Sequence, residues 1–240
     1  MLEVSGLKVR YYGRPVINGV SLKLGPCLAA LIGPNGSGKT TLLKAVAGIV
    51  DYEGTVRICG RDVRRMDPYE KASHVTYVPP TIAALPDMSV GDLLLTGPNI
   101  SFERLERYID LLGLRNLLYR RLWEVSSGEL ERALIARGLA RDSRVYLIDE
   151  PLSYTDMRYQ LIIMKHLRQL ARNGKLVIVA SNQLNPLLNY VDHILALRDG
   201  RLFINAPLSE GLDEEALSKL YGVRVRIIVS DGLIDAIPVE

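Results

Sequence analysis

The 240-residue sequence is poor in cysteine and in long apolar runs, and it has almost no excess of charge. Its two cysteines, Cys27 and Cys59, have no metal-like spacing, which predicts buried small apolar side chains in a reducing cytosol. No apolar run reaches the ~18 residues of a membrane span, and no signal-like start is present, so we predict a soluble chain. With 30 basic and 27 acidic residues, bulk charge gives no reason to expect a nucleic acid partner.

A glycine-rich stretch fits the pattern G-x-x-x-x-G-K-[ST] at every fixed position. The apolar run 28–32 before it predicts a buried strand, and residues 41–48 after it predict an amphipathic helix, which is the context that a phosphate loop requires. We expect Lys39 to reach the β- and γ-phosphates of a nucleotide, Thr40 to bind Mg²⁺, and Thr41 to cap the helix or touch the α-phosphate. The predicted nucleotide-binding residues of this stretch are Gly33, Pro34, Asn35, Gly36, Ser37, Gly38, Lys39, Thr40 and Thr41.

A second informative stretch lies about 90 residues further on, by the printed numbering. The segment 125–129 (VSSGE) precedes a long predicted helix, and the apolar strand 145–148 ends in Asp149 and Glu150. A carboxylate at the end of a buried strand suits a metal-linked role, so we expect Asp149 to hold Mg²⁺ through water. We expect Glu150 to orient or deprotonate the attacking water. Tyr12, upstream of the phosphate loop, either stacks on an adenine ring or packs on the edge of a strand.

Alternating apolar residues predict antiparallel strands at 2–11 and 16–24, joined through a turn at 13–15. Further strands are expected at 54–59 and 74–78, and helices at 89–95 and 101–112. We therefore predict one α/β domain over residues 1–240. Its core comprises 1–86 and 143–240, a mixed sheet flanked by helices with an added antiparallel β layer. Residues 87–142 form an inserted helical subdomain.

Together these stretches resemble the ATP-binding cassette (ABC) ATPases, the motor subunits of ABC transporters. GPNGSGKTT at 33–41 resembles their phosphate loop, VSSGE at 125–129 their signature, and VYLIDEP at 145–151 their Walker B strand with its catalytic glutamate. Asp156 matches the aspartate of the loop that crosses the dimer interface, and Ser181-Asn182 matches the switch loop. The resemblance covers nearly the whole chain.

The resemblance implies a head-to-tail dimer that sandwiches ATP and Mg²⁺ between the phosphate loop of one cassette and the signature of the other. The residues implied in binding on the signature side are Ser126, Ser127, Gly128, Glu129 and Asp156. The second cassette is either the same chain or a different one. The other implied partners are transmembrane permease subunits, which would place the protein in the cytoplasm, peripheral on the inner face of the cell membrane.

Three departures from the family pattern lie around the γ-phosphate. Pro80 replaces a glutamine, Asn182 replaces the switch histidine, and the signature has Ser127 and Glu129 in place of a glycine and a glutamine. Thr81 could substitute for the lost glutamine oxygen. Because losing one preorganised donor typically slows a reaction by about 10²–10³, we expect hydrolysis to be slow.

The C-terminal helix 214–220, the sequence Leu-Tyr-Gly-Val at 220–223 and the final strands 224–229 and 234–239 resemble importer ATPases for iron chelates, haem and cobalamin. Residues 86–90 and 93–97 resemble the coupling region of the same group. Two alternatives stay open. One is a soluble ABC ATPase for assembly, of the iron–sulfur type, and the other is a hydrolysis-impaired regulatory cassette of a heterodimer.

Overall fold

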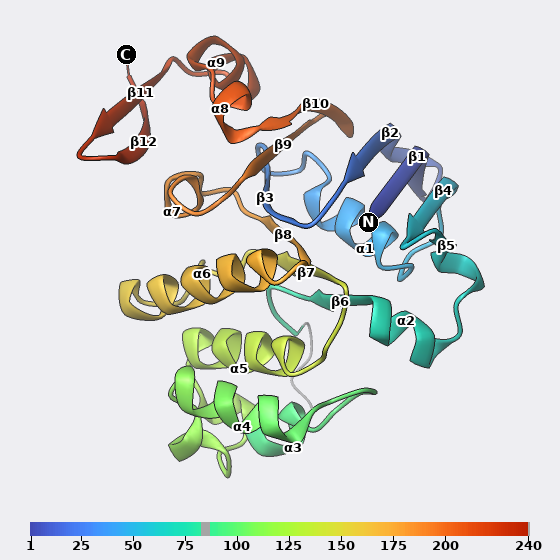
Figure 1. The fold of residues 1–240 in the computed structure, drawn as a ribbon, viewed down its shortest axis with the longest axis vertical. Coiled ribbons are helices and arrows are strands. Elements are labelled where there is room, and N and C mark those ends of the chain that lie inside the picture. Colours follow the sequence, from blue (N-terminus) through green and yellow to red (C-terminus); the bar gives the residue numbers. More distant parts are fainter. Residues whose placement is uncertain (83–86, 240) are drawn as a thin grey trace.

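The computed structural model, which describes residues 1–82 and 87–239, contains two larger sheets with one helix between them (Figure 1). The first sheet is antiparallel and has the strand order β2-β1-β4-β5. Its strands are β1 Leu2–Tyr11, β2 Arg14–Leu24, β4 Glu53–Ile58 and β5 Arg61–Asp62. Their apolar residues alternate, so one face of this sheet is buried and the other is solvated.

The second sheet has the order β10-β9-β3-β8-β7-β6. All its strands are parallel except the edge strand β10, which forms a hairpin with β9. The strands are β3 Cys27–Ile32, β6 Val75–Val78, β7 Val145–Asp149, β8 Leu176–Ala180, β9 His193–Arg198 and β10 Arg201–Pro207. The β3, β7 and β8 segments are nearly continuous apolar runs because both faces of this sheet are covered.

The helices are α1 Lys39–Val46, α2 Pro68–His74, α3 Val90–Leu94, α4 Phe102–Leu111, α5 Ser127–Leu139, α6 Met157–Arg172, α7 Asn185–Leu188, α8 Leu208–Gly211 and α9 Glu214–Tyr221. Short 3₁₀ turns lie at Val63–Arg65, Arg115–Leu117 and Leu122–Glu124. The chain ends in a separate hairpin of β11 Val225–Ser230 and β12 Leu233–Pro238. In the described ranges no helix is both long and apolar enough to cross a bilayer.

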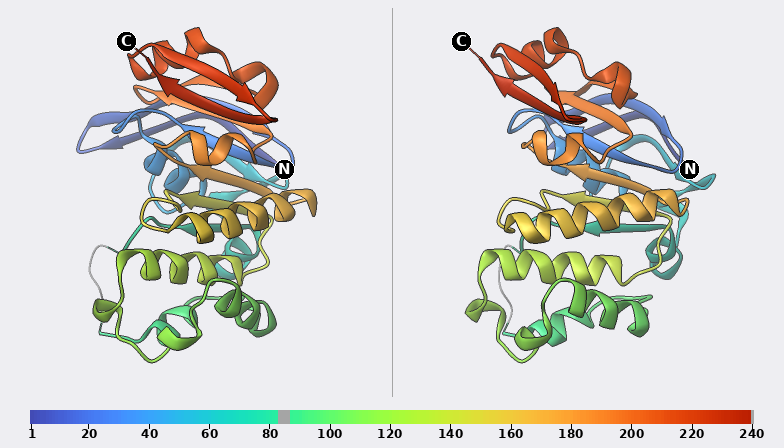
Figure 2. Two further views of the ribbon diagram at one scale, coloured as in Figure 1. Left: turned by 90° about the vertical axis from the view of Figure 1, so that its left-hand side faces the viewer. Right: turned by 60° about the vertical axis from the view of Figure 1, so that its left-hand side comes forward.

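The two faces of the parallel sheet belong to two hydrophobic clusters, and β3 contributes to both. Leu28, Ala30 and Ile32 face the cluster that α5 and α6 share, whereas Ala29 and Leu31 face α1 and the antiparallel sheet. Figure 2 shows α6, then α5, then α3 and α4 stacked in layers away from the sheet. This arrangement confirms the predicted α/β phosphate-loop core with an antiparallel β layer and added helices.

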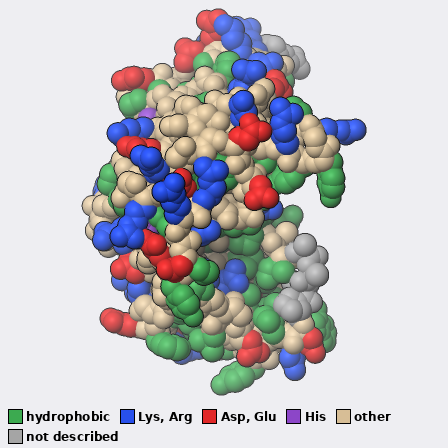
Figure 3. All heavy atoms as spheres, turned by 90° about the vertical axis from the view of Figure 1, so that its right-hand side faces the viewer, with side chains coloured by type: hydrophobic (Ala, Val, Ile, Leu, Met, Phe, Trp, Pro, Cys, Tyr) green, Lys and Arg blue, Asp and Glu red, His purple; other side chains and the backbone are tan. Residues whose placement is uncertain are grey.

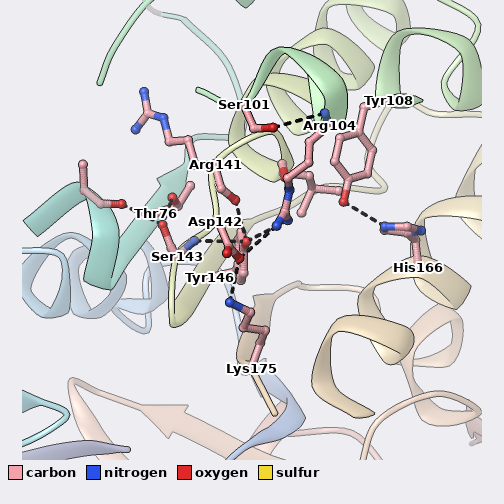
Figure 4. A network of polar contacts seen from close by, with 12 residues as sticks. Thr76, Ser101, Arg104, Tyr108, Arg141, Asp142, Ser143, Tyr146, His166 and Lys175 are labelled. Carbon is pink, nitrogen blue, oxygen red and sulfur yellow. Dashed lines mark hydrogen bonds and ion pairs between the residues drawn. The ribbon is translucent and has the colours of Figure 1, made fainter. Parts of the chain in front are cut away.

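A polar network joins the outer helices to the core (Figure 4). Arg104 of α4 donates hydrogen bonds to Asp142 at 2.9 Å and to the hydroxyl of buried Tyr146 on β7 at 3.3 Å. Lys175, just before β8, donates to the same Asp142 carboxylate at 2.7 Å. Because these groups come from helix, loop and strand, the network fixes how α4 lies against the sheet.

Several local predictions were wrong at their edges. The first hairpin turns at Tyr12-Gly13, both with positive φ, and Pro15 belongs to β2. Proline is tolerated there because β2 is an edge strand. Cys59 is exposed in a turn with φ of 52°, so its predicted burial was wrong, whereas Cys27 is partly buried against the core. Of the coupling segment 86–90, residue 86 lies outside the described residues.

Candidate functional site

The phosphate loop leaves β3 at its carboxyl end and turns directly into α1. Gly38 caps the helix with φ of 104°, which a residue with a side chain rarely adopts. Gly33 lies so close to β9 that an added Cβ would stand 2.2 Å from the carbonyl oxygen of Leu197. The two glycines therefore let the loop lie tightly against β9 while the first N–H groups of α1 stay available for an anion.

Lys39 is buried inside this loop. Its Nζ donates to the carbonyl oxygens of Gly33 at 2.8 Å and Pro34 at 3.3 Å. Burial lowers the pKa of Lys39, while the negative charges of Glu150 and Asp149 oppose the shift. The ammonium group thus lies where the loop and the two carboxylates meet, as a lysine that contacts terminal phosphates must.

Asp149 ends β7, two strands away from β3 in the parallel sheet. Its Oδ2 accepts a hydrogen bond of 3.1 Å from the hydroxyl of Tyr77, which lies on the neighbouring strand β6. Its Oδ1 is buried and makes no well-formed hydrogen bond within the part of the chain that the structure describes. Burial raises the pKa of Asp149, while Thr40, Tyr77 and the charge of Lys39 oppose the rise.

Glu150 follows with φ of 50°, which turns its side chain out of the strand direction. Its Oε2 accepts from the backbone N–H of Asn182 at 3.3 Å and, at longer distances, from the hydroxyls of Ser153 and Ser181. The side-chain amide of Asn182 also donates to the side-chain oxygen of Asn35, in the phosphate loop, at 3.5 Å. Burial raises the pKa of Glu150, so this carboxylate accepts a proton more readily than an exposed one.

These groups surround one cavity of about 260 Å³ at the carboxyl edge of the parallel sheet. Its lining residues are Val16, Asn35, Gly36, Gly38, Lys39, Thr40, Thr41 and Glu150. The structure thus brings together six predicted loop residues and the predicted catalytic glutamate. Val16 on β2 was not singled out from the sequence, since nothing in a strand pattern marks which residue faces a ligand.

The signature residues line a second cavity of about 350 Å³. Its lining residues are Ser126, Ser127, Gly128, Glu129, Arg132, Tyr154, Thr155 and Asp156. Ser126 caps α5: its Oγ accepts from the N–H of Glu129, and the Glu129 carboxylate accepts from the backbone N–H of Ser126 at 2.8 Å. These described residues share none with the first cavity, so the structure does not bring the signature and the phosphate loop together.

One tyrosine that was predicted as a site residue lies away from the two cavities, and another that contacts the site was not predicted. Tyr12 lies fully exposed at the tip of the first hairpin and lines neither of these two cavities. Tyr77, which binds Asp149, was not predicted as a site residue, because its position depends on the register of β6 against β7. Pro80 lies two residues beyond the end of β6, in irregular backbone.

The donor set fits a magnesium ion. Mg²⁺ prefers hard oxygen ligands and keeps several waters, so it needs only one or two protein groups beside phosphate oxygens. Two such groups lie next to the loop: the Thr40 hydroxyl, and the buried Oδ1 of Asp149, which makes no well-formed hydrogen bond with the described residues. When bound, the ion would neutralise charge that develops on the terminal phosphates.

The fold and the site define a phosphate-loop ATPase. A family model described as ABC transporter matches residues 17–153. The hemin import ATP-binding protein HmuV of Rhizobium meliloti (strain 1021) is 32% identical over 251 residues, covering 96% of this chain and 94% of that protein. The chain therefore belongs to the ABC transporter family, in which it is an ABC ATPase subunit.

Solved structures agree on the fold. An inward-facing ABC transporter, provisionally assigned to the metal-chelate type, aligns with a TM-score of 0.78 at 22% identity, covering 100% of this chain and 97% of the other. A dimeric ATP-binding cassette in a post-hydrolysis state, bound to ADP and Pi, aligns with a TM-score of 0.76 at 22% identity, covering 87% and 99%.

Proposed function

We propose that this chain is the ATP-hydrolysing motor subunit of an ABC importer. The observation that carries the proposal is the convergence of Lys39, Asp149 and Glu150 around one edge of the parallel sheet. Lys39 would bind the β- and γ-phosphates, Asp149 and Thr40 would hold Mg²⁺, and Glu150 would orient or deprotonate the attacking water.

The active unit is a head-to-tail dimer with a second cassette, either the same chain or a different one. The separation of the phosphate-loop cavity from the signature cavity supports this, because each offers only part of a nucleotide site. In the dimer Ser126, Ser127 and Gly128, at the N-terminal turn of α5, would face the γ-phosphate of the nucleotide bound to the other cassette. Residues 87–142 would act as the helical signature subdomain beside the core of 1–86 and 143–240.

Turnover is slow because two groups near the γ-phosphate are altered. Asn182 donates its backbone N–H to Glu150, but its side chain cannot carry the positive charge of a protonated histidine. Pro80 has no side-chain oxygen for the metal or the water. A regulatory cassette that binds ATP without hydrolysing it remains the second candidate, favoured by these two residues.

Exposed apolar side chains on the outer helices support docking of a transmembrane permease. Leu95, Phe102 and Trp123 are each more than half exposed. Figure 3 shows more hydrophobic side chains over the lower part of one face than over its upper part, with some acidic and basic groups among them. Such a patch fits an apolar partner surface better than a nucleic acid. Docking there would hold the chain on the inner face of the membrane.

The transported solute would be a haem-like or metal-chelate compound. This proposal depends on the hemin import relatives, whose likeness extends over nearly the whole chain. It also fits the helix α9 and the hairpin β11–β12, whose predicted sequence segments resemble that importer group. A soluble assembly ATPase of the iron–sulfur type gains no support from these relatives.

The test is steady-state ATPase activity of the purified chain with Mg²⁺, with nucleotide binding measured in parallel. We expect slow turnover that Glu150→Gln abolishes while ATP still binds. Asn182→His, which restores a chargeable donor, should raise kcat by about tenfold or more. Tight ATP binding without any turnover in the wild-type chain would contradict a self-sufficient motor, and it would favour a regulatory cassette or a motor that needs a different, complete second cassette.

A further inference from the structure

Glu131 is a buried carboxylate to which the nucleotide chemistry above assigns no role. It lies in the second turn of α5 and is only 3% exposed. A carboxylate in such a place is costly unless its oxygens receive hydrogen bonds. The residues that donate hydrogen bonds to Glu131 therefore show which segment of the chain it holds in place.

Within the described part of the chain, the hydrogen bonds that Glu131 accepts come from the loop that follows β7. Oε1 accepts from the backbone N–H of Ser153 at 3.2 Å, and Oε2 accepts from the backbone N–H of Tyr154 at 3.2 Å. Oε2 also accepts from the Thr155 hydroxyl. Burial raises the pKa of Glu131, and these hydrogen bonds oppose the rise. One side chain thus fastens three consecutive loop residues to α5.

The loop is fastened from its other side as well. The side-chain amide of Gln160, on α6, donates to the carbonyl oxygens of Leu152 at 3.0 Å and Thr155 at 2.9 Å. The loop therefore donates hydrogen bonds to Glu131 on α5 and accepts hydrogen bonds from Gln160 on α6. Few other conformations would satisfy both sets of buried groups.

The same loop contacts both half-sites. Ser153 donates its hydroxyl to Glu150 Oε2 at 3.4 Å, beside the phosphate-loop cavity. The carbonyl of Tyr154 packs against Gly128, where an added Cβ would stand only 2.5 Å from that oxygen. Tyr154 and Thr155 also line the signature cavity. A displacement of this loop would therefore shift Glu150 and the signature turn together.

We propose that Glu131 is a positioning residue that holds the 153–155 loop so that Glu150 and the signature turn keep a fixed relative geometry. The inference rests on the proposed function, since only in the head-to-tail dimer do these two half-sites serve two different nucleotides. Glu131 then links the catalytic group of one ATP site to the phosphate donors of the other.

The test compares Glu131→Gln with the wild-type chain. Glutamine keeps the size of the side chain, but its NH₂ group faces donors and cannot accept from them. We expect kcat for ATP to fall about tenfold or more, since small misplacements of a catalytic group are costly. KM should stay within about threefold, since Lys39 and Thr40 are untouched. A thermal melt checks that the variant is folded.

The matched control is Glu124→Gln, which removes the same charge from an exposed capping residue that does not contact the loop. Thr155→Val removes one donor from the loop side and is the milder test should Glu131→Gln not fold. In a double-mutant cycle, Glu131→Gln and Thr155→Val should be strongly non-additive. Independent, multiplying effects would overturn the link.

The outcomes separate the two proposals. A wild-type chain without turnover overturns the proposed self-pairing motor, and the positioning role, which is tested in that dimer, falls with it. Wild-type turnover with an unchanged kcat in folded Glu131→Gln overturns the positioning role alone. A loss of kcat that Glu124→Gln reproduces has the same consequence, because it would reflect charge and not the loop.

Discussion

Asp149→Asn should stabilise the free protein and at the same time weaken its response to magnesium nucleotide. Asp149 is 1% exposed, and the structure provides one good donor, the Tyr77 hydroxyl, to its two carboxylate oxygens. Asparagine keeps the shape of the side chain and removes the buried charge. Its NH₂ group can also donate to neighbouring oxygens.

The magnitude follows from the unpaired oxygen. A buried acceptor without a partner costs about 1–3 kcal/mol, so we expect the free energy of unfolding of the free protein to rise by about 1–2 kcal/mol in Asp149→Asn. At a ligand concentration 100 times Kd, the wild-type chain should gain about 2.7 kcal/mol from Mg-ATP. Asp149→Asn should lose most of the part of this gain that depends on the metal. The variant should therefore be the more stable protein in EDTA, and the wild-type chain the more stable one in Mg-ATP.

Chemical denaturation in three buffers measures this: EDTA alone, ATP with EDTA, and ATP with Mg²⁺. The matched control is Asp199→Asn, at an exposed turn position with φ of 50° that asparagine also tolerates, and it should change neither quantity. An Asp149→Asn protein that is less stable than wild type in EDTA would refute the reasoning. So would one that gains as much as wild type from Mg-ATP.

Two further predictions concern the network that joins α4 to the core. Tyr146→Phe should lower the free energy of unfolding by about 2 kcal/mol in denaturant titrations, because it leaves the buried N–H of Ser143 and the carbonyl of Arg141 without the Tyr146 hydroxyl; a change under about 0.5 kcal/mol would contradict this. His166 of α6 shares a 2.8 Å hydrogen bond with Tyr108 of α4. Burial lowers the pKa of His166 to about 4, so the unfolded chain takes up the proton first and stability falls as pH drops from about 6.5 toward 4. His166→Gln should remove roughly 2 kcal/mol of this fall, after allowance for solvent at the half-buried ring, and equal pH slopes in the two proteins would count against it.

The features that were predicted best are those that depend on residues adjacent in the sequence. The phosphate loop, its strand and its helix were identified because the glycines, Lys39 and the flanking apolar runs are contiguous. The strand that ends in Asp149 was found for the same reason.

What it missed depends on contacts between distant segments. Tyr77 reaches Asp149 only through the pairing of β6 with β7, and Glu131 reaches its loop only because α5 packs beside the end of β7. The position of Pro15 in β2 also required knowing that β2 is an edge strand. No periodicity in a single segment carries that information.

The most direct test of the composite ATP site is a complementation assay with two inactive variants. Lys39→Ala removes the phosphate-loop charge. Ser127→Glu places a negative charge in the signature turn, where it suits the helix N-terminus and leaves the Ser126–Glu129 cap intact. Each variant alone should lose the turnover of the wild-type chain.

A mixture of the two should regain part of that turnover. In a head-to-tail dimer of one chain of each kind, one site combines the intact phosphate loop with the intact signature. Recovery in the mixture is the result that our account predicts for a self-pairing chain. Wild-type turnover by Ser127→Glu alone would contradict the account, because the signature would then take no part in hydrolysis.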